Sequence, residues 1–197
     1  MRIGIFGGSF DPVHLGHLIP LWFSQDYLSL NRLILVPGFQ TPFKRHYQPM
    51  TTAEQRLAML SLATQHFHTM EICHWELQRK EPVYTIETVE YLQAKYTAQE
   101  WFLLIGQDNW AHFLNWRDHE RLAHKCQLAV MQRPGAPSPA VSPYPYIAIP
   151  SPLIEISGTQ VREWRQKGKP WELLVPPAVA QYIHYHHIYQ EEDTCPA

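Results

Sequence analysis

The chain of 197 residues is 45% hydrophobic and 17% charged, a composition that supports one buried core and excludes a disordered protein. Its 16 Lys and Arg residues against 18 Asp and Glu residues give a net charge of −2, which excludes a broad cationic surface for a nucleic-acid backbone. The apolar runs are too short to cross a bilayer, so no membrane partner is expected.

The compartment is predicted from the cysteines and from the start of the chain. Cys73, Cys126 and Cys195 are odd in number and scattered, which is typical of a reducing compartment rather than of a disulfide framework or a zinc site. The first six residues lead directly into a glycine motif and leave no room for a signal peptide. We therefore expect a cytoplasmic protein.

Short apolar runs alternate with segments of helical periodicity along the chain. The expected strands are 3–6, 32–36, 69–75, 101–105 and 127–131, and the expected helices are 18–27, 51–63, 84–95, 154–165 and 177–187. In the helix over 51–63, Thr52 and Gln55 form a plausible capping box, and Leu57, Leu60 and Leu62 are expected on its inner face. The proline-rich segment 134–145 is predicted to be a surface loop.

This alternation predicts an α/β fold, a Rossmann-like doubly wound parallel sheet with a small helical C-terminal subdomain. We expect one domain over residues 1–197, with the sheet core in 1–150 and the helical subdomain in 151–197. In such sheets the ligand crevice lies beyond the carboxyl ends of the strands. The segments 7–17, 37–45, 106–108 and 133–134, which follow strands, should therefore share one site.

The segment 7–17, which we call the first signature, has the sequence Gly-Gly-Ser-Phe-Asp-Pro-Val-His-Leu-Gly-His. A glycine turn that joins a first strand to a helix N-terminus is where α/β proteins bind phosphates. His14 and His17 are three residues apart, so one helical turn lets both face the same bound group. Asp11 is interpreted as a turn or capping residue.

The first signature matches the nucleotidyltransferase pattern GGxFxPxHxGH at every fixed position. The segment 156–162, Ile-Ser-Gly-Thr-Gln-Val-Arg, is the second signature and resembles the family's C-terminal ISSTxIR, with Gly158 in place of a serine. Ser157 would cap a helix whose free N–H groups meet a phosphate, and Arg162 would hold two phosphate oxygens.

The segments between the two signatures resemble the nicotinate-mononucleotide adenylyltransferase family. Residues 41–44, Thr-Pro-Phe-Lys, stand where that family commonly has PPHK; Phe43 replaces the histidine, so only Lys44 is carried over. Residues 84–88 fit YTxxT, and Gly106 and Asp108 with Trp116 fit GxD…W. Arg133 follows a strand, as the family's triphosphate arginine does.

The resemblance implies a reaction of ATP with nicotinate mononucleotide that yields deamido-NAD and pyrophosphate in NAD biosynthesis. It implies magnesium carried by ATP, with no protein ligand assigned to the metal. The implied catalytic residues are His14, His17, Lys44 and Arg162. The implied ATP-binding residues are Gly7, Gly8, Ser9, Phe10, His14, Gly16, His17, Lys44, Gly106, Asp108, Arg133, Ser157, Thr159 and Arg162. The implied acceptor-binding residues are Ser9, Phe10, Lys44, Tyr84, Thr85, Asp108, Trp116 and Arg117.

Within this implied site, Gly16 would leave room for the adenosine, and Trp116 would stack on the pyridine ring. Thr85 and the backbone amides near Trp116 and Arg117 would meet the acceptor's carboxylate, so that an acid is preferred over an amide. The alternative for Trp116 is an ordinary core tryptophan.

Other functions stay open at this point. The first signature also fits a phosphopantetheine adenylyltransferase or a cytidylyltransferase, and a non-catalytic nucleotide-binding regulator is a further alternative. The histidines at 184, 186 and 187 are interpreted as solvated or interface residues rather than metal ligands. The oligomeric state is open, with a homo-oligomer among the options.

Overall fold

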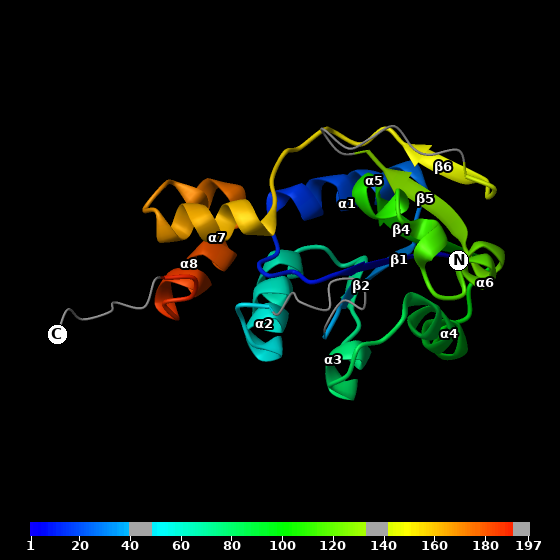
Figure 1. Ribbon diagram of the computed structural model, residues 1–197, viewed down its shortest axis with the longest axis horizontal. Helices are drawn as coiled ribbons and strands as arrows, with labels where there is room; N and C mark the ends of the chain where they lie inside the picture. Colours follow the sequence, from blue (N-terminus) through cyan, green and yellow to red (C-terminus); the bar gives the residue numbers. More distant parts are fainter. Residues whose placement is uncertain (40–48, 133–141, 191–197) are drawn as a thin grey trace.

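A computed structural model describes residues 1–39, 49–132 and 142–190. In this part of the chain, six parallel strands form one sheet in the order β3-β2-β1-β4-β5-β6 (Figure 1). The strands are β1 (Arg2–Gly8), β2 (Arg32–Pro37), β3 (Met70–Ile72), β4 (Glu100–Gly106), β5 (Gln127–Met131) and β6 (Tyr146–Ile149). The strand order reverses between β1 and β4, which confirms the predicted doubly wound parallel sheet.

The central strands are apolar on both faces, as strands covered by helices on each side must be. In β2, Leu33 and Leu35 point to one face, and Ile34 and Val36 point to the other. The first face packs against α1 (Leu15–Tyr27) and α2 (Ala53–Thr64), and the second against α4 (Thr85–Lys95) and α6 (His119–Lys125). The sheet is thus the middle layer of three.

Helix α2 begins with the predicted capping box. The Thr52 hydroxyl accepts a hydrogen bond from the Gln55 amide at 3.2 Å, and the Gln55 side chain accepts one from the Thr52 amide at 3.0 Å. Of the three leucines predicted on its inner face, Leu60 is buried and Leu62 packs against the core cluster, whereas Leu57 is not part of that cluster. Leu57 and Leu62 are partly buried, and the fully buried positions include a charged residue, Arg56.

Several short elements differ from the sequence-based expectation. The third strand ends at Ile72, and Trp75 starts the short helix α3 (Trp75–Arg79) instead of ending the strand. Strand β6, helix α5 (Gln107–Trp110), helix α6 and the turn η1 (Phe113–Asn115) were not predicted. These elements span seven residues or fewer, too short for a periodic pattern to be distinctive.

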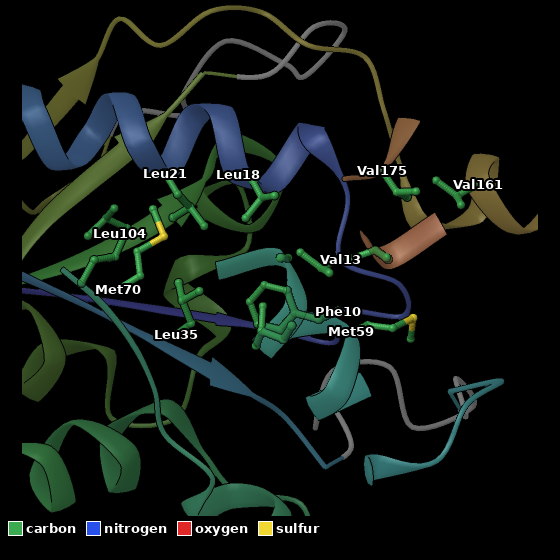
Figure 2. Close-up of a cluster of buried hydrophobic side chains, with 14 of the residues drawn as sticks. Phe10, Val13, Leu18, Leu21, Leu35, Met59, Met70, Leu104, Val161 and Val175 are labelled. Atoms are coloured by element: carbon green, nitrogen blue, oxygen red, sulfur yellow. The ribbon is translucent and has the colours of Figure 1, made fainter. Parts of the chain in front are cut away.

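The C-terminal helices α7 (Gly158–Gln166) and α8 (Pro177–Tyr185) lie at one end of the molecule, beside α2 and the start of α1 (Figure 1). The turn η2 (Trp171–Leu174) connects them. Val161 and Val175 belong to the same buried cluster as Phe10 and Val13, next to which Figure 2 shows them. This segment therefore packs on the core of the sheet, and a division at residue 150 stays a prediction.

No helix within residues 1–39, 49–132 and 142–190 combines the length and the apolarity that a membrane crossing requires.

Candidate active site

The main cavity, of about 650 Å³, opens at the carboxyl ends of β1 and β4. Gly7 and Gly8 line it at the end of β1, and Gly106 lines it at the end of β4. Ser157 and Thr159 also line it at the start of α7. The cavity therefore lies where the strand order reverses, which is the usual ligand site of an open α/β sheet.

The two histidines of the first signature are stacked on one another at the entrance of α1. His14 is the N-cap residue of α1, and its ring centroid lies 3.7 Å from that of His17, at an interplanar angle of 27°. His14 is 1% exposed, and the His17 ring packs 5.2 Å from the Phe10 ring. Both histidines line the cavity, so the predicted spacing does bring them to one place.

Phe10, predicted to bind both substrates, does not offer its ring to the cavity. The Phe10 ring is fully buried in the core and does not line the cavity. Its backbone has a φ of 49°, and the ring folds beneath Gly8, where an added Cβ would lie 3.2 Å from it. The glycine thus makes room for a core aromatic under the loop, and a role of Phe10 in substrate binding stays a prediction.

The second signature forms a capped helix start, as predicted. The Ser157 hydroxyl accepts a hydrogen bond from the Gln160 amide at 3.1 Å. Arg162, one turn into α7, donates to the Asp11 carbonyl oxygen at 2.5 Å and to the Thr159 hydroxyl at 3.1 Å. Its side chain is 11% exposed and lines the cavity.

Two glycines allow the two signatures to touch. A Cβ on Gly16 would lie 2.6 Å from the Ile156 carbonyl oxygen, and one on Gly158 would lie 3.0 Å from the Asp11 carbonyl oxygen. Gly16 therefore leaves room for the backbone of the second signature, and its predicted room for adenosine stays a prediction. Asp11 lies in a turn together with Pro12, which is one of the two roles predicted for it, and His14 is the N-cap residue of α1.

The predicted acceptor residues lie on a different wall of the same cavity. Thr85 is the first residue of α4, and the Arg117 guanidinium lies 4.6 Å from the centre of the Tyr84 ring. Trp116 is partly buried against the core ring of Phe113 at 5.5 Å and lines the cavity. Trp116 therefore packs on the core and also borders the cavity, and its stacking on the pyridine ring stays a prediction.

Asp108 completes this wall beside Gly106. A Cβ on Gly106 would lie 2.6 Å from a carboxylate oxygen of Asp108, so the glycine leaves space for that side chain over the end of β4. Asp108 lines the cavity as predicted.

Glu76 on α3 also lines the cavity, and no pattern in the sequence pointed to it. Its carboxyl group accepts a hydrogen bond from the Thr88 hydroxyl at 2.5 Å. Burial raises the pKa of Glu76 to about 7, the Thr88 hydrogen bond opposes this rise, and the nearby Glu87 charge adds to it. Other lining residues that were not predicted are His112, Asn115 and Gln132.

Arg56 is a buried cation that joins two loops of the site. Its guanidinium donates to the carbonyl oxygens of Ser9 at 2.8 Å, Gly38 at 2.6 Å and Phe39 at 3.4 Å. These carbonyls follow β1 and β2, so α2 fixes the two loop starts relative to each other. A signal was present in the sequence, because Arg56 precedes Met59 and Leu60 at the spacing of one helical face.

The predicted site residues Lys44 and Arg133 lie outside the described residues. The other predicted residues, apart from Phe10, line one cavity, which the first and second signatures and α4 build together. Among residues 1–39, 49–132 and 142–190, no three His, Cys, Asp or Glu side chains are grouped as metal ligands would be.

A parallel sheet with a glycine loop, paired histidines and a capped helix start at its switch point defines a nucleotide-binding protein of the nucleotidyltransferase class. The family model of cytidylyltransferase-like proteins matches residues 5–164. A Thermus thermophilus protein named probable nicotinate-nucleotide adenylyltransferase is 35% identical over 190 residues, which cover 96% of this chain and 100% of that protein. A protein of the same name from Methylacidiphilum infernorum is 37% identical over 195 residues, 95% of this chain and 92% of that one. The chain therefore belongs to the nicotinate-nucleotide adenylyltransferases within the cytidylyltransferase-like family, as the sequence predicted.

Solved structures agree on the fold. Nicotinic acid mononucleotide adenylyltransferase of Plasmodium falciparum, complexed with NaAD, superposes with a TM-score of 0.76 at 18% identity. The match covers 95% of this chain and 97% of that one. A putative nicotinate-nucleotide adenylyltransferase from Vibrio parahaemolyticus gives a TM-score of 0.71 at 17% identity and covers 97% of this chain and 96% of its own.

Proposed function

We propose that this protein transfers the adenylyl group of ATP to nicotinate mononucleotide and so forms deamido-NAD and pyrophosphate in NAD biosynthesis. One observation carries the proposal: two signatures more than 130 residues apart in the sequence meet at one cavity, together with the acceptor-type residues of α4 and of the turn after β4. This is the arrangement that a reaction between two phosphate-bearing substrates requires.

The reaction needs no protein nucleophile. A 5′-phosphate oxygen of the mononucleotide forms a bond to the α-phosphorus of ATP, and the bond from that phosphorus to the bridging oxygen of the β-phosphate breaks. Pyrophosphate leaves with that oxygen. Catalysis then consists of aligning two anions and stabilising the charge on the reacting oxygens.

His14, His17 and Arg162 supply the donors on the ATP side. The imidazoles donate to phosphate oxygens, and Arg162 adds a delocalised cation beside the N–H groups at the start of α7. Lys44 and Arg133 are proposed to hold the β- and γ-phosphates, on the strength of the family resemblance. Magnesium is proposed to arrive with ATP, held by phosphate oxygens and water, and to neutralise part of the phosphate charge.

The acceptor side is proposed to recognise an aromatic acid. Trp116 offers a ring face to the pyridine, and Thr85 offers a hydroxyl and a helix N-terminus to the carboxylate. Because the positive end of a helix favours an anion, the acid should be preferred over the corresponding amide.

Pyrophosphate release from ATP tests the proposal, with nicotinate mononucleotide, nicotinamide mononucleotide and phosphopantetheine as separate acceptors. Rapid release is expected with the nicotinate form and a much lower kcat/KM with the amide. Release with phosphopantetheine alone would favour that adenylyltransferase instead, and no release with any acceptor would favour a regulator. The cytoplasmic location stays a prediction of the sequence.

A further inference from the structure

The Asp11 carboxylate, which the proposed reaction does not use, connects three distant segments. Asp11 is 2% exposed. One of its carboxylate oxygens accepts hydrogen bonds from the hydroxyls of Thr51 and Tyr189, both at 2.6 Å, and the other accepts one from the Met50 amide at 2.9 Å. Tyr189 is 178 residues away in the sequence, just beyond α8. Asp11 thus ties the first signature to the approach of α2 and to the C-terminal segment.

The backbone of Asp11 orients a residue of the ATP side. Its carbonyl oxygen accepts from the Arg162 guanidinium at 2.5 Å, and a carboxylate oxygen lies 3.9 Å from the same guanidinium nitrogen. A shift of Asp11 would therefore move the cation that lines the cavity. The hydroxyl of Tyr189 is one of the groups that hold the side chain of Asp11.

The Tyr189 hydroxyl keeps the proton that it donates to Asp11. It is 4% exposed, and burial together with the Asp11 charge raises the pKa of its hydroxyl above the ordinary range. Its backbone has a φ of 59°, an uncommon conformation for a residue with a side chain, and the preceding Ile188 is buried and bonded to the Ile183 carbonyl oxygen at 3.0 Å. The end of α8 therefore sets where the hydroxyl lies.

We infer that Tyr189 is a positioning residue of the ATP site: its hydroxyl holds Asp11, and through Asp11 it orients Arg162 toward the phosphates. The inference rests on the proposed function for the identity of the ligand. It makes the C-terminal segment part of the machinery that binds ATP, although Tyr189 itself is not in the cavity wall.

The test compares Tyr189→Phe with Tyr185→Phe. The first variant keeps the ring and loses the hydroxyl, and the second is the same change four residues earlier at a side chain that is 81% exposed. Calorimetric titration measures the dissociation constants of α,β-methylene-ATP and of nicotinate mononucleotide. Tyr189→Phe is expected to weaken binding of the ATP analogue about fivefold, since a hydrogen bond to a charged group is lost, and to leave the mononucleotide within about twofold. Tyr185→Phe should change neither.

A double-mutant cycle separates positioning from simple loss of stability. In an Arg162→Ala background, Tyr189→Phe is expected to change binding of the analogue by less than about twofold, because the group through which it acts is gone. The inference would be overturned by the same loss of analogue affinity in both backgrounds, by an equal loss of affinity for both ligands, or by no loss of affinity at all. If Tyr189→Phe does not fold, Thr51→Val removes the other hydroxyl on the same oxygen and should give the same selective loss.

A failure of the proposed function can be distinguished from a failure of the inference about Tyr189. A protein that binds the analogue but releases no pyrophosphate with any acceptor would contradict the proposed reaction. The cycle on analogue binding would still decide the role of Tyr189.

Discussion

Replacing Glu76 with glutamine should remove a pH dependence from the stability of the protein. Burial raises the pKa of Glu76 from its ordinary 4.5 to about 7. Between these two values the folded state keeps the proton that the unfolded state has already lost. The stabilising effect of the protonated group is complete below pH 4.5 and is lost as the pH rises through 7.

The size of the effect follows from the shift. A difference of one in pKa corresponds to about 1.36 kcal/mol, so the rise from 4.5 to about 7 sets an upper limit of about 3 kcal/mol on the free energy involved. The Thr88 hydroxyl, which donates to the carboxyl group at 2.5 Å, reduces the cost of ionisation and is already included in the shift. Glutamine keeps the shape and the acceptor oxygen and cannot ionise.

Urea unfolding followed by tryptophan fluorescence at pH 5 and pH 7.5 measures this effect. Between pH 5 and pH 7.5, the free energy of unfolding of the wild-type protein should fall by about 2–3 kcal/mol more than that of Glu76→Gln. Apart from Glu76, the ionisable groups of the two proteins are identical, so their contribution to the free energy of unfolding cancels in the difference. Glu163→Gln, at an exposed carboxylate 3.5 Å from Lys167, serves as the control. Its free energy of unfolding should change with pH as that of the wild type does. Identical pH slopes for wild type and Glu76→Gln would refute the assigned burial of this carboxyl group.

Three further substitutions test the rest of the site. His17→Ala should lower kcat about 10²–10³-fold and leave the urea midpoint close to that of the wild type, as loss of one preorganised donor does; unchanged turnover would remove its catalytic role. Trp116→Ala should raise KM for nicotinate mononucleotide far more than KM for ATP, and an equal rise in both would contradict stacking on the pyridine. Arg56→Met should destabilise the fold by about 3 kcal/mol in urea unfolding, because three carbonyl oxygens lose a buried donor; a change below about 1 kcal/mol would show that these bonds are replaced by water.

The sequence by itself determined the local features of this protein. The capping box of Thr52 and Gln55 and the cap of Ser157 on Gln160 join residues three apart, so their spacing encodes them directly. The strand over 127–131 and the buried positions Ile86, Val89 and Leu92 of α4 follow from apolar runs and helical periodicity. The two signatures were recognisable for the same reason, since each lies in one continuous segment.

Only the tertiary structure decided which distant groups meet. Arg56 and Ser9 are 47 residues apart in the sequence, and Asp11 and Tyr189 are 178 residues apart. Gly16 and the Ile156 carbonyl, which also meet, are more than 130 residues apart. The hydroxyl that donates to the Glu76 carboxyl group likewise comes from another helix, at Thr88 of α4. The spacing of hydrophobic residues predicts which side of a helix or strand is buried, but not which other segment covers that side. The packing of distant segments sets the orientation of Arg162 and the shape of the cavity.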